Sequence, residues 1–194
     1  MNDLAGLRLP PAADAIYSES RARNFAMVSE PLTGVLLRTL AAAKPGGRFL
    51  ELGTGTGAAT AWILDGMDAT SSLVSVETDS ELLAVAQAHL GADSRITFVH
   101  ADAADFLQRA EGQQFDLILA DTWGGKYEGL DSALRLLPHG GVYVIDDMSP
   151  QPNWPPGHDT KVAGLLARLE ADPHLRITKL SWASGIVIAV RVAG

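Results

Sequence analysis

Residues 48–57 read Arg48-Phe49-Leu50-Glu51-Leu52-Gly53-Thr54-Gly55-Thr56-Gly57, and the helix-prone run Ala58-Ala59-Thr60-Ala61-Trp62 follows. A short apolar run with one acidic residue thus leads into three glycines that alternate with threonines. A strand, a tight glycine turn and a helix N-terminus in this order are typical of open α/β sheets, which bind nucleotide-like ligands at the turn. Glycine suits such a turn because it adopts positive φ angles and has no Cβ to hold a ligand away from the backbone. We therefore expect a ligand at residues 53–57.

The chemistry of this turn indicates the kind of ligand. Gly57 comes two residues after Gly55 rather than three, so the spacing differs from the usual dinucleotide-binding pattern. Glu51 would repel a pyrophosphate and attract a cation. The pattern Glu-x-Gly-x-Gly-x-Gly resembles the first motif of the class I S-adenosylmethionine-dependent methyltransferases, whose cofactor carries a sulfonium and an ammonium group. The resemblance implies that the site of this cofactor is formed by Glu51, Gly53, Thr54, Gly55, Gly57 and Thr60.

Two acidic residues end the next two predicted strands. Glu77 follows the β-prone run 73–76, and its two carboxylate oxygens could accept hydrogen bonds from both ribose hydroxyls. Asp102 follows the run 96–100, and the methyltransferase resemblance implies that it accepts a hydrogen bond from the adenine amino group. Thr78 and Ala103 adjoin these acids and are expected to line the same site. The alternative for either acid is an ordinary helix N-terminal or solvated role.

The composition fits one globular domain. The chain has 194 residues, of which 47% are hydrophobic, and this is enough to bury one good core. No apolar stretch has membrane-spanning length, and the start Met1-Asn2-Asp3-Leu4 has no basic region before an apolar one, so we expect neither a transmembrane helix nor a signal peptide. The absence of cysteine excludes disulfides, thiolate metal sites and a cysteine nucleophile, and it suits a cytoplasmic protein.

The charge argues for a small-molecule substrate. The formal net charge is −8 and no cluster of lysine and arginine occurs in the sequence. Nucleic acids bind through basic patches, so a nucleic acid partner is not expected.

Strand and helix signals alternate along the chain. We expect strands near 48–52, 73–77, 95–100, 115–120 and 141–145, with helices near 58–66, 80–90, 103–110 and 128–137, after two N-terminal helices that begin near Pro11 and at Pro31. Such alternation predicts a parallel sheet covered on both faces. Two further strands near 175–180 and 186–190 are joined too briefly to be parallel. The predicted fold class is therefore α/β, with a Rossmann-like, seven-stranded, mostly parallel sheet and an antiparallel C-terminal hairpin.

The domain organisation follows from the same pattern. We expect a single domain over 1–194, in which N-terminal helices (1–45) precede a cofactor-binding core (46–147). The last part, 148–194, comprises a Pro-rich acceptor loop, a helix and the β-hairpin. The loop over 149–157 is too rich in proline for a helix or a central strand, and Asp159 is a candidate N-cap for a helix near 160–170.

Within the methyltransferases, the stretch from Met27 to Met148 resembles the small metal-dependent O-methyltransferases of the catechol and caffeoyl-coenzyme A type and their bacterial relatives. The resemblance rests on the segment 115–121, the Leu-Leu-Pro-His-Gly-Gly run at 136–141 and the strand ending in Asp146-Asp147. It implies that Asp121, Asp146 and Asp147 bind a divalent metal, although the last position is usually Asn in the family. Mg²⁺ would hold two acceptor oxygens and lower a hydroxyl pKa. The alternative is that Asp121 binds the cofactor or orders a loop while the other two carboxylates bond to the Pro-rich segment.

The chain departs from this family at one position. The family has a lysine, its general base, three residues after the first metal-binding aspartate, and here that residue is Gly124. Lys126 is a candidate catalytic residue because two glycines before it permit an unusual loop path, but a solvated surface lysine is the favoured interpretation. His158 is a second candidate base, since histidine titrates near neutrality, but a partly exposed loop residue ahead of a helix cap is the favoured interpretation. Asp121, between cofactor and acceptor, completes the candidate catalytic residues.

The remaining expectations concern the edges of the site. By resemblance, Met27, Val28 and Ser29 cap the methionine end of the cofactor. Trp123, Tyr127 and Trp154 fall on loops at the cofactor edge, where they either wall a flat acceptor or simply pack. The predicted function is S-adenosylmethionine-dependent methylation, on an oxygen of a small molecule. The rivals are a non-catalytic S-adenosylmethionine-binding protein and a nicotinamide-dependent oxidoreductase. The N-terminal helix and the hairpin edge are surfaces that a homodimer could use.

Overall fold

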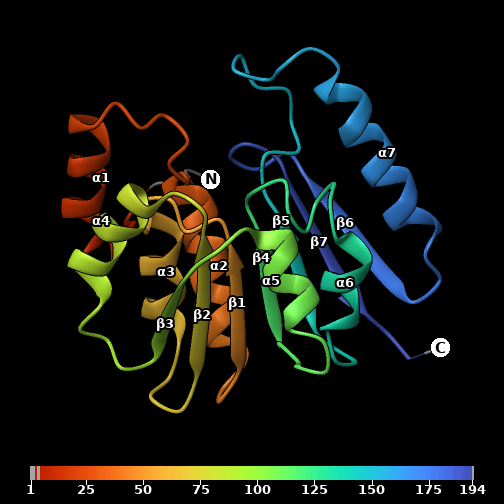
Figure 1. The fold of residues 1–194 in the computed structure, drawn as a ribbon, viewed down its shortest axis with the longest axis horizontal. Helices are drawn as coiled ribbons and strands as arrows, with labels where there is room; N and C mark the ends of the chain where they lie inside the picture. The colour runs from red at the N-terminus through yellow and green to blue at the C-terminus, as the bar shows by residue number, and fades with distance from the viewer. Residues whose placement is uncertain (1–2, 4, 194) are drawn as a thin grey trace.

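A seven-stranded sheet forms the centre of the molecule (Figure 1). The computed structural model describes residue 3 and residues 5–193. Positions 1, 2, 4 and 194, which belong to the predicted domain, lie outside the described part, and so does most of the start segment 1–4. The strand order is β3-β2-β1-β4-β5-β7-β6, in which β1 to β5 pair in parallel and β7 is antiparallel to both neighbours. The strands are β1 (Arg48–Leu52), β2 (Ser72–Glu77), β3 (Ile96–His100), β4 (Leu117–Ala120), β5 (Val142–Ile145), β6 (Leu175–Leu180) and β7 (Ile186–Arg191).

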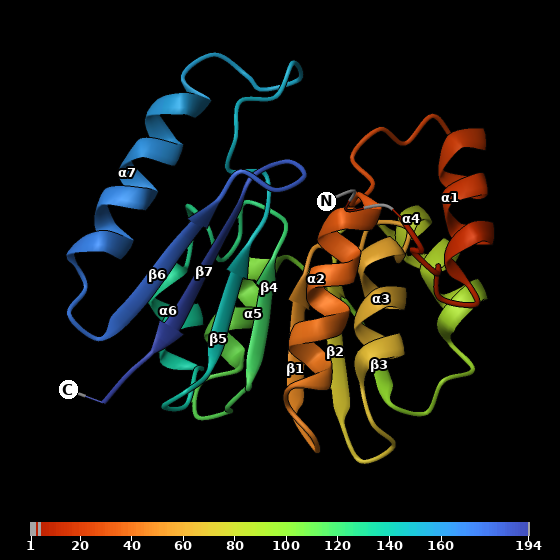
Figure 2. The same cartoon turned by 180° about the vertical axis from the view of Figure 1, so that it is seen from behind.

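Helices cover both faces of the sheet, as Figures 1 and 2 show from opposite sides. One apolar core lies under α5, α6 and α7, and a second under α1, α2 and α3. The central strands β1, β4 and β5 supply apolar side chains to both cores, which is why they read as continuous apolar runs. The helices are α1 (Ala13–Ala22), α2 (Pro31–Ala42), α3 (Ala58–Gly66), α4 (Ser80–Leu90), α5 (Ala103–Arg109), α6 (Leu130–Arg135) and α7 (His158–Ala171).

The strand register brings the functional segments together. Leu52, the last residue of β1, is paired with Val76 on one side and with Ala120 on the other. The chain order reverses at β1, which lies between β2 and β4, and open α/β sheets bind ligands beside such a switch point, outside the carboxyl ends of the strands. The glycine turn after β1, Glu77 after β2 and Asp121 after β4 therefore meet at one edge of the sheet.

The predicted fold class is confirmed, with differences at element ends. The helix predicted over 128–137 is shorter, because Gly129 at φ 72° precedes its first turn. The last helix begins at His158, two residues before the predicted start, and its N-cap is Gly157 at φ 80° rather than Asp159. His158 is consequently a helical residue and the prediction of a loop position was wrong. Within residues 3 and 5–193, no helix combines the length and the hydrophobicity that a membrane span requires.

Candidate functional site

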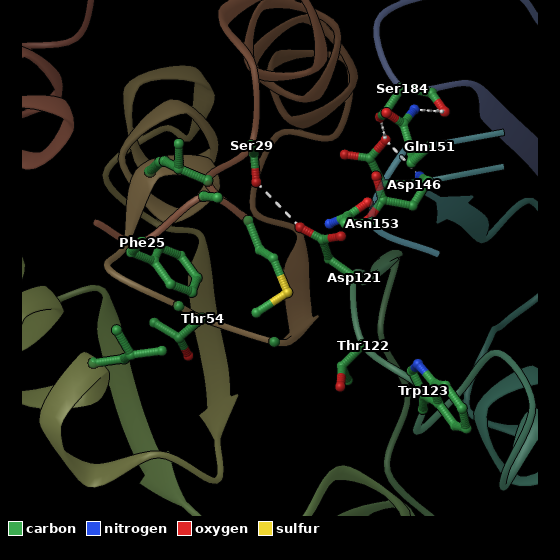
Figure 3. Close-up of a pocket in the computed structure, with 18 of the residues that line it drawn as sticks. Phe25, Ser29, Thr54, Asp121, Thr122, Trp123, Asp146, Gln151, Asn153 and Ser184 are labelled. Atoms are coloured by element: carbon green, nitrogen blue, oxygen red, sulfur yellow. Dashed lines mark hydrogen bonds between the residues drawn. The ribbon is translucent and has the colours of Figure 1, made fainter. Parts of the chain in front are cut away.

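A cavity of about 520 Å³ lies at the carboxyl ends of the parallel strands. Figure 3 shows the side chains that surround it, which come from the segment before α2, the glycine turn, and the loops after β4 and β5. Most of the residues predicted for the site line this cavity, namely Met27, Val28, Ser29, Gly53, Thr54, Gly55, Glu77, Thr78, Asp121, Trp123, Lys126, Asp146, Asp147 and His158. Five predicted residues, Glu51, Gly57, Thr60, Asp102 and Ala103, do not.

The glycine turn has the backbone geometry that its sequence predicts. Gly53, Gly55 and Gly57 all have positive φ, at 97°, 54° and 92°. A Cβ on Gly53 would lie 2.8 Å from the backbone oxygen of Asp121, so no larger residue fits there without moving β1 or β4. Gly57 is the N-cap of α3. The turn thus presents bare backbone to the cavity and packs directly against Asp121, the residue that follows β4.

Glu77 fastens the turn to β2. Its Oε2 accepts a hydrogen bond from Gly55 N–H at 2.7 Å, and its Oε1 accepts from the backbone N–H groups of Thr78 and Asp79, each at 2.9 Å. A carboxylate oxygen has two lone pairs, so Oε1 is fully used and Oε2 keeps capacity for one further hydrogen bond from a ligand at the cavity. Glu77 therefore has a structural role, and its contact with a ribose stays a prediction.

Glu51 lies beneath the turn rather than in the cavity. Its side chain is fully buried, and its Oε2 accepts hydrogen bonds from Thr60 Oγ1 at 2.6 Å and Ser75 Oγ at 2.5 Å. Oε1 has no hydrogen-bond partner among the described residues. Burial raises the pKa of Glu51 from 4.5 to about 7, with a further contribution from the charge of Glu77. The residue supports the turn from below together with Thr60, which differs from the direct cofactor contact predicted for both.

Asp102 and Ala103 lie at the start of α5. Asp102 is the N-cap of this helix, where its Oδ1 accepts hydrogen bonds from the N–H groups of Ala104 at 2.8 Å and Asp105 at 3.0 Å. This is the helix N-terminal role that the sequence left open. Contact with adenine stays a prediction for both residues.

The segment 25–30 crosses the cavity from the N-terminal side. Ser29 Oγ donates a hydrogen bond to Asp121 Oδ2 at 3.1 Å (Figure 3), and Ser29 O accepts one from the Tyr17 hydroxyl at 3.1 Å. Phe25 lies against Gly55, while Met27 between these two anchored residues is 70% exposed. The segment is thus fixed to both α1 and the tip of β4.

Lys126 is buried at the tips of β4 and β5, so the favoured interpretation of it as a solvated surface residue was wrong. The side chain is 6% exposed. Its Nζ donates a hydrogen bond to the backbone oxygen of Asp146 at 2.8 Å and lies 3.9 Å from Asp121 Oδ1. Burial and the neighbouring charge of Asp146 raise the pKa of Asp121 well above its usual range, although Lys126 acts in the opposite direction. A cation and two buried carboxyl groups therefore share this corner of the cavity.

His158 closes the other side of the cavity among aromatic rings. It is 7% exposed, and its Nε2 lies 3.1 Å from the Tyr127 hydroxyl. The ring of Trp154 is 4.6 Å from the imidazole and the ring of Trp123 is 5.8 Å away, measured between centroids. The imidazole Nδ1 is buried and has no hydrogen-bond partner in the described part of the chain. The favoured interpretation of His158 as a partly exposed residue was therefore wrong, and the three loop aromatics line the cavity.

Comparison with known proteins adds the family to this geometry. A family model described as a methyltransferase domain matches residues 50–148, which is half of the chain. The chain belongs to this methyltransferase family. A protein from Mycobacterium marinum, provisionally named an O-methyltransferase, is 30% identical over 172 residues, which cover 83% of this chain and 76% of that protein.

Solved structures have the same fold as this methyltransferase. An O-methyltransferase from Bacillus cereus matches with a TM-score of 0.84 at 20% identity, covering 96% of this chain and 93% of its own. The O-methyltransferase TomG from Streptomyces achromogenes matches with a TM-score of 0.85 at 20% identity, covering 97% and 92%.

Metal binding by the three aspartates Asp121, Asp146 and Asp147 stays a prediction. Among residues 3 and 5–193, no group of three acidic or histidine side chains has the spacing of metal ligands. Asp146 Oδ1 accepts hydrogen bonds from Ser184 Oγ and from Asp147 N–H, the latter at 2.8 Å, and Asp147 takes a positive φ of 58°. One carboxylate oxygen of Asp121 and one of Asp146 are thus hydrogen-bonded within the protein, and a divalent cation at this place would compete with these bonds.

The sequence analysis missed several residues of the site. Phe25, Asp79, Leu82, Thr122, Gln151, Asn153 and Ser184 also line the cavity. Ser184 belongs to the turn between β6 and β7, and only the pairing of β5 with β7 brings it beside Asp146. Asp79 could have been found from the sequence, because it lies two residues after Glu77 and immediately before an apolar helical run, where it is the N-cap of α4.

Proposed function

We propose that this methyltransferase transfers the methyl group of S-adenosylmethionine to an oxygen atom of a small molecule. The observation that carries the proposal is a single cavity with two different ends. The glycine turn and Glu77 line one end, while Asp121, Lys126 and His158 line the other. The Bacillus cereus protein is described in complex with S-adenosylhomocysteine and TomG in complex with S-adenosylmethionine, which supports the choice of cofactor.

The proposed binding mode follows the cavity from β2 to β4. Glu77 accepts a hydrogen bond from the ribose, and the backbone of Gly53 and Gly55 lies against the adenosyl group. The segment 27–29 covers the methionine end, where the carboxyl of Asp121 faces the positively charged groups of the cofactor.

The proposed reaction depends more on the alignment of the acceptor oxygen with the methyl group than on chemical activation of the methyl donor. The acceptor oxygen forms a bond to the methyl carbon, the carbon–sulfur bond breaks, and its electron pair returns to sulfur to give S-adenosylhomocysteine. The hydroxyl proton leaves for a base. Because the sulfonium is already reactive, holding the two reactants in line within a dry cavity supplies much of the rate.

We assign the base to His158. Its Nδ1 is buried, so the acceptor's proton reaches the imidazole through Tyr127, whose hydroxyl lies 3.1 Å from Nε2. In the tautomer whose Nε2 is unprotonated, the Tyr127 hydroxyl passes its proton to Nε2 as it takes the proton of the acceptor. The aromatic rings of Trp123 and Trp154 would hold a flat acceptor beside it. A net charge of −8 supports a small molecule rather than a nucleic acid. A homodimer and a cytoplasmic location stay predictions from the sequence.

Calorimetric titration tests cofactor choice. S-adenosylhomocysteine is expected to bind with a Kd on the order of 10 μM, or about 7 kcal/mol, and NAD⁺ is expected not to saturate. Tight binding of NAD⁺ alone would favour the oxidoreductase and overturn the proposal.

Transfer of a labelled methyl group to a panel of hydroxyl and amine acceptors tests the reaction. His158→Asn is expected to lower the rate about 100-fold, as for loss of a general base, while cofactor affinity is retained. If the wild-type protein binds cofactor but methylates no acceptor, it is the non-catalytic binding protein instead.

A further inference from the structure

The loop after β4 brings a lysine ammonium to the point where three aspartates adjoin the cavity. Lys126 Nζ donates a hydrogen bond to the backbone oxygen of Asp146, which follows β5, and lies near Asp121, which follows β4. We propose that this ammonium takes the place of the divalent cation of the metal-dependent O-methyltransferases, and that this cavity works without a divalent metal. The inference rests on the proposed methyl transfer, because it concerns the charges that surround the acceptor in that reaction.

The backbone fixes Lys126 in this position. Gly125, directly before it, has φ of 89°, and a Cβ there would lie 2.6 Å from Leu52 Cδ1 and 2.9 Å from the Tyr143 hydroxyl. The Tyr143 hydroxyl donates a hydrogen bond to Gly125 O at 2.6 Å, and Gly125 N–H donates to Glu128 O at 2.6 Å. Because Gly125 packs against the core, the following side chain turns inward. The burial of the lysine is therefore a property of the fold.

The carboxylates of Asp121 and Asp146 are already hydrogen-bonded within the protein. Asp121 Oδ2 accepts from Ser29, and Asp146 Oδ1 accepts from Ser184 and the backbone. Mg²⁺ requires nearly octahedral oxygen ligands at about 2.0–2.1 Å, so it would have to displace these hydrogen bonds and the ammonium. A lysine demands no such geometry, because it is a point charge with three donors on a flexible stem.

The same charge serves the acceptor end. An ammonium held in a buried corner stabilises negative charge that develops on a nearby oxygen, and it needs no reorganisation during the reaction. It also offsets part of the repulsion between Asp121 and Asp146, which both face the cavity. Lys126 thus supplies the electrostatic part of what a metal would do, although it cannot grip two acceptor oxygens as a metal does.

Mn²⁺ titration followed by electron paramagnetic resonance tests the inference without any need for the natural acceptor. The samples contain saturating S-adenosylhomocysteine, with and without catechol as a bidentate probe. Wild-type protein is expected to show no saturable binding of Mn²⁺ below about 10 mM. The Lys126→Met variant loses the positive charge but keeps a side chain of similar volume. It is expected to bind Mn²⁺ with a Kd on the order of 1 mM or tighter, which is the weak end of the range for carboxylate sites. Lys44→Met is the matched control, because Lys44 is an exposed lysine bonded to Gly140 O, and it is expected to behave as wild type.

Two results would overturn the inference. One is wild-type binding of Mn²⁺ tighter than about 0.1 mM that Asp121→Asn abolishes, since this would establish an ordinary carboxylate site. The other is a Lys126→Met protein that binds S-adenosylhomocysteine but takes up no Mn²⁺. If Lys126→Met fails to fold, the wild-type titration decides. Failure of the proposed function appears separately, as absence of S-adenosylhomocysteine binding by the wild-type protein.

Discussion

The two ends of the cavity are built by different means. The cofactor end consists largely of backbone from three neighbouring strand ends, held by hydrogen bonds such as that from Gly55 N–H to Glu77. The acceptor end consists of side chains from the loops after β4 and β5 and from the β6–β7 turn, which lie far apart in the sequence. A backbone site depends on the main-chain conformation at a few positions, whereas a side-chain site depends on tertiary packing. The two ends should therefore respond differently to substitution.

The largest effect is expected at Gly53. Gly53→Ala forces a left-handed conformation on alanine and drives its Cβ into the backbone of Asp121. We expect the Kd for S-adenosylhomocysteine, measured by calorimetry, to rise at least about 100-fold, or ~2.7 kcal/mol. Gly140→Ala is the control, because Gly140 has φ of 78° but nothing within 4 Å of a new Cβ. Equal loss of affinity in both variants would mean that strain alone, rather than the contact with β4, explains the result.

The next effect concerns Glu51 and pH. The unfolded chain ionises this carboxyl above about pH 4.5, but the folded protein keeps it protonated up to about pH 7. The folded state therefore loses stability as pH rises from 4.5 to 7, and the loss is constant above that. Glu51→Gln cannot ionise, so its free energy of unfolding in urea should exceed that of wild type by about 2–3 kcal/mol at pH 8 but differ little at pH 4.5. The exposed Glu81→Gln serves as control, and a difference that is the same at both pH values would refute the burial argument.

Glu77 should give a smaller effect on cofactor binding. Glu77→Ala frees the turn at Gly55 and removes the proposed ribose acceptor, and we expect an increase in Kd of about 10- to 30-fold, or ~1.4–2 kcal/mol. Glu77→Gln keeps one acceptor oxygen and should lie between alanine and wild type. Unchanged affinity in the alanine variant would contradict both the structural and the binding role.

The smallest effect sharpens the contrast between the two ends. Trp154→Leu removes an aromatic wall of the acceptor end, and the Kd for S-adenosylhomocysteine should change less than about threefold, or ~0.7 kcal/mol. Acceptor methylation should fall by a larger factor in the same variant. A large loss of cofactor affinity would show that the two ends are not separable.

This contrast also explains what the sequence could predict. The glycine turn, the strand ends and the hairpin were predicted because local patterns determine them, and the structure agrees with these element positions. The burial of Lys126 was not predicted, since it depends on Gly125 packing against Leu52 and Tyr143, which are distant in sequence. The buried position of Glu51 likewise depends on Ser75 and Thr60. The start of α7 at His158 depends on a left-handed Gly157, and glycine alone does not reveal its φ.

The close approach of Gly53 to the carbonyl of Asp121 has a consequence for how such an enzyme can evolve to methylate different acceptors. Because backbone packs on backbone here, the distance between the methyl donor and the methyl acceptor does not depend on the side-chain rotamers of the surrounding loops. The loop sequences around the acceptor can then change to suit new acceptor compounds, while the alignment of the reacting atoms stays the same.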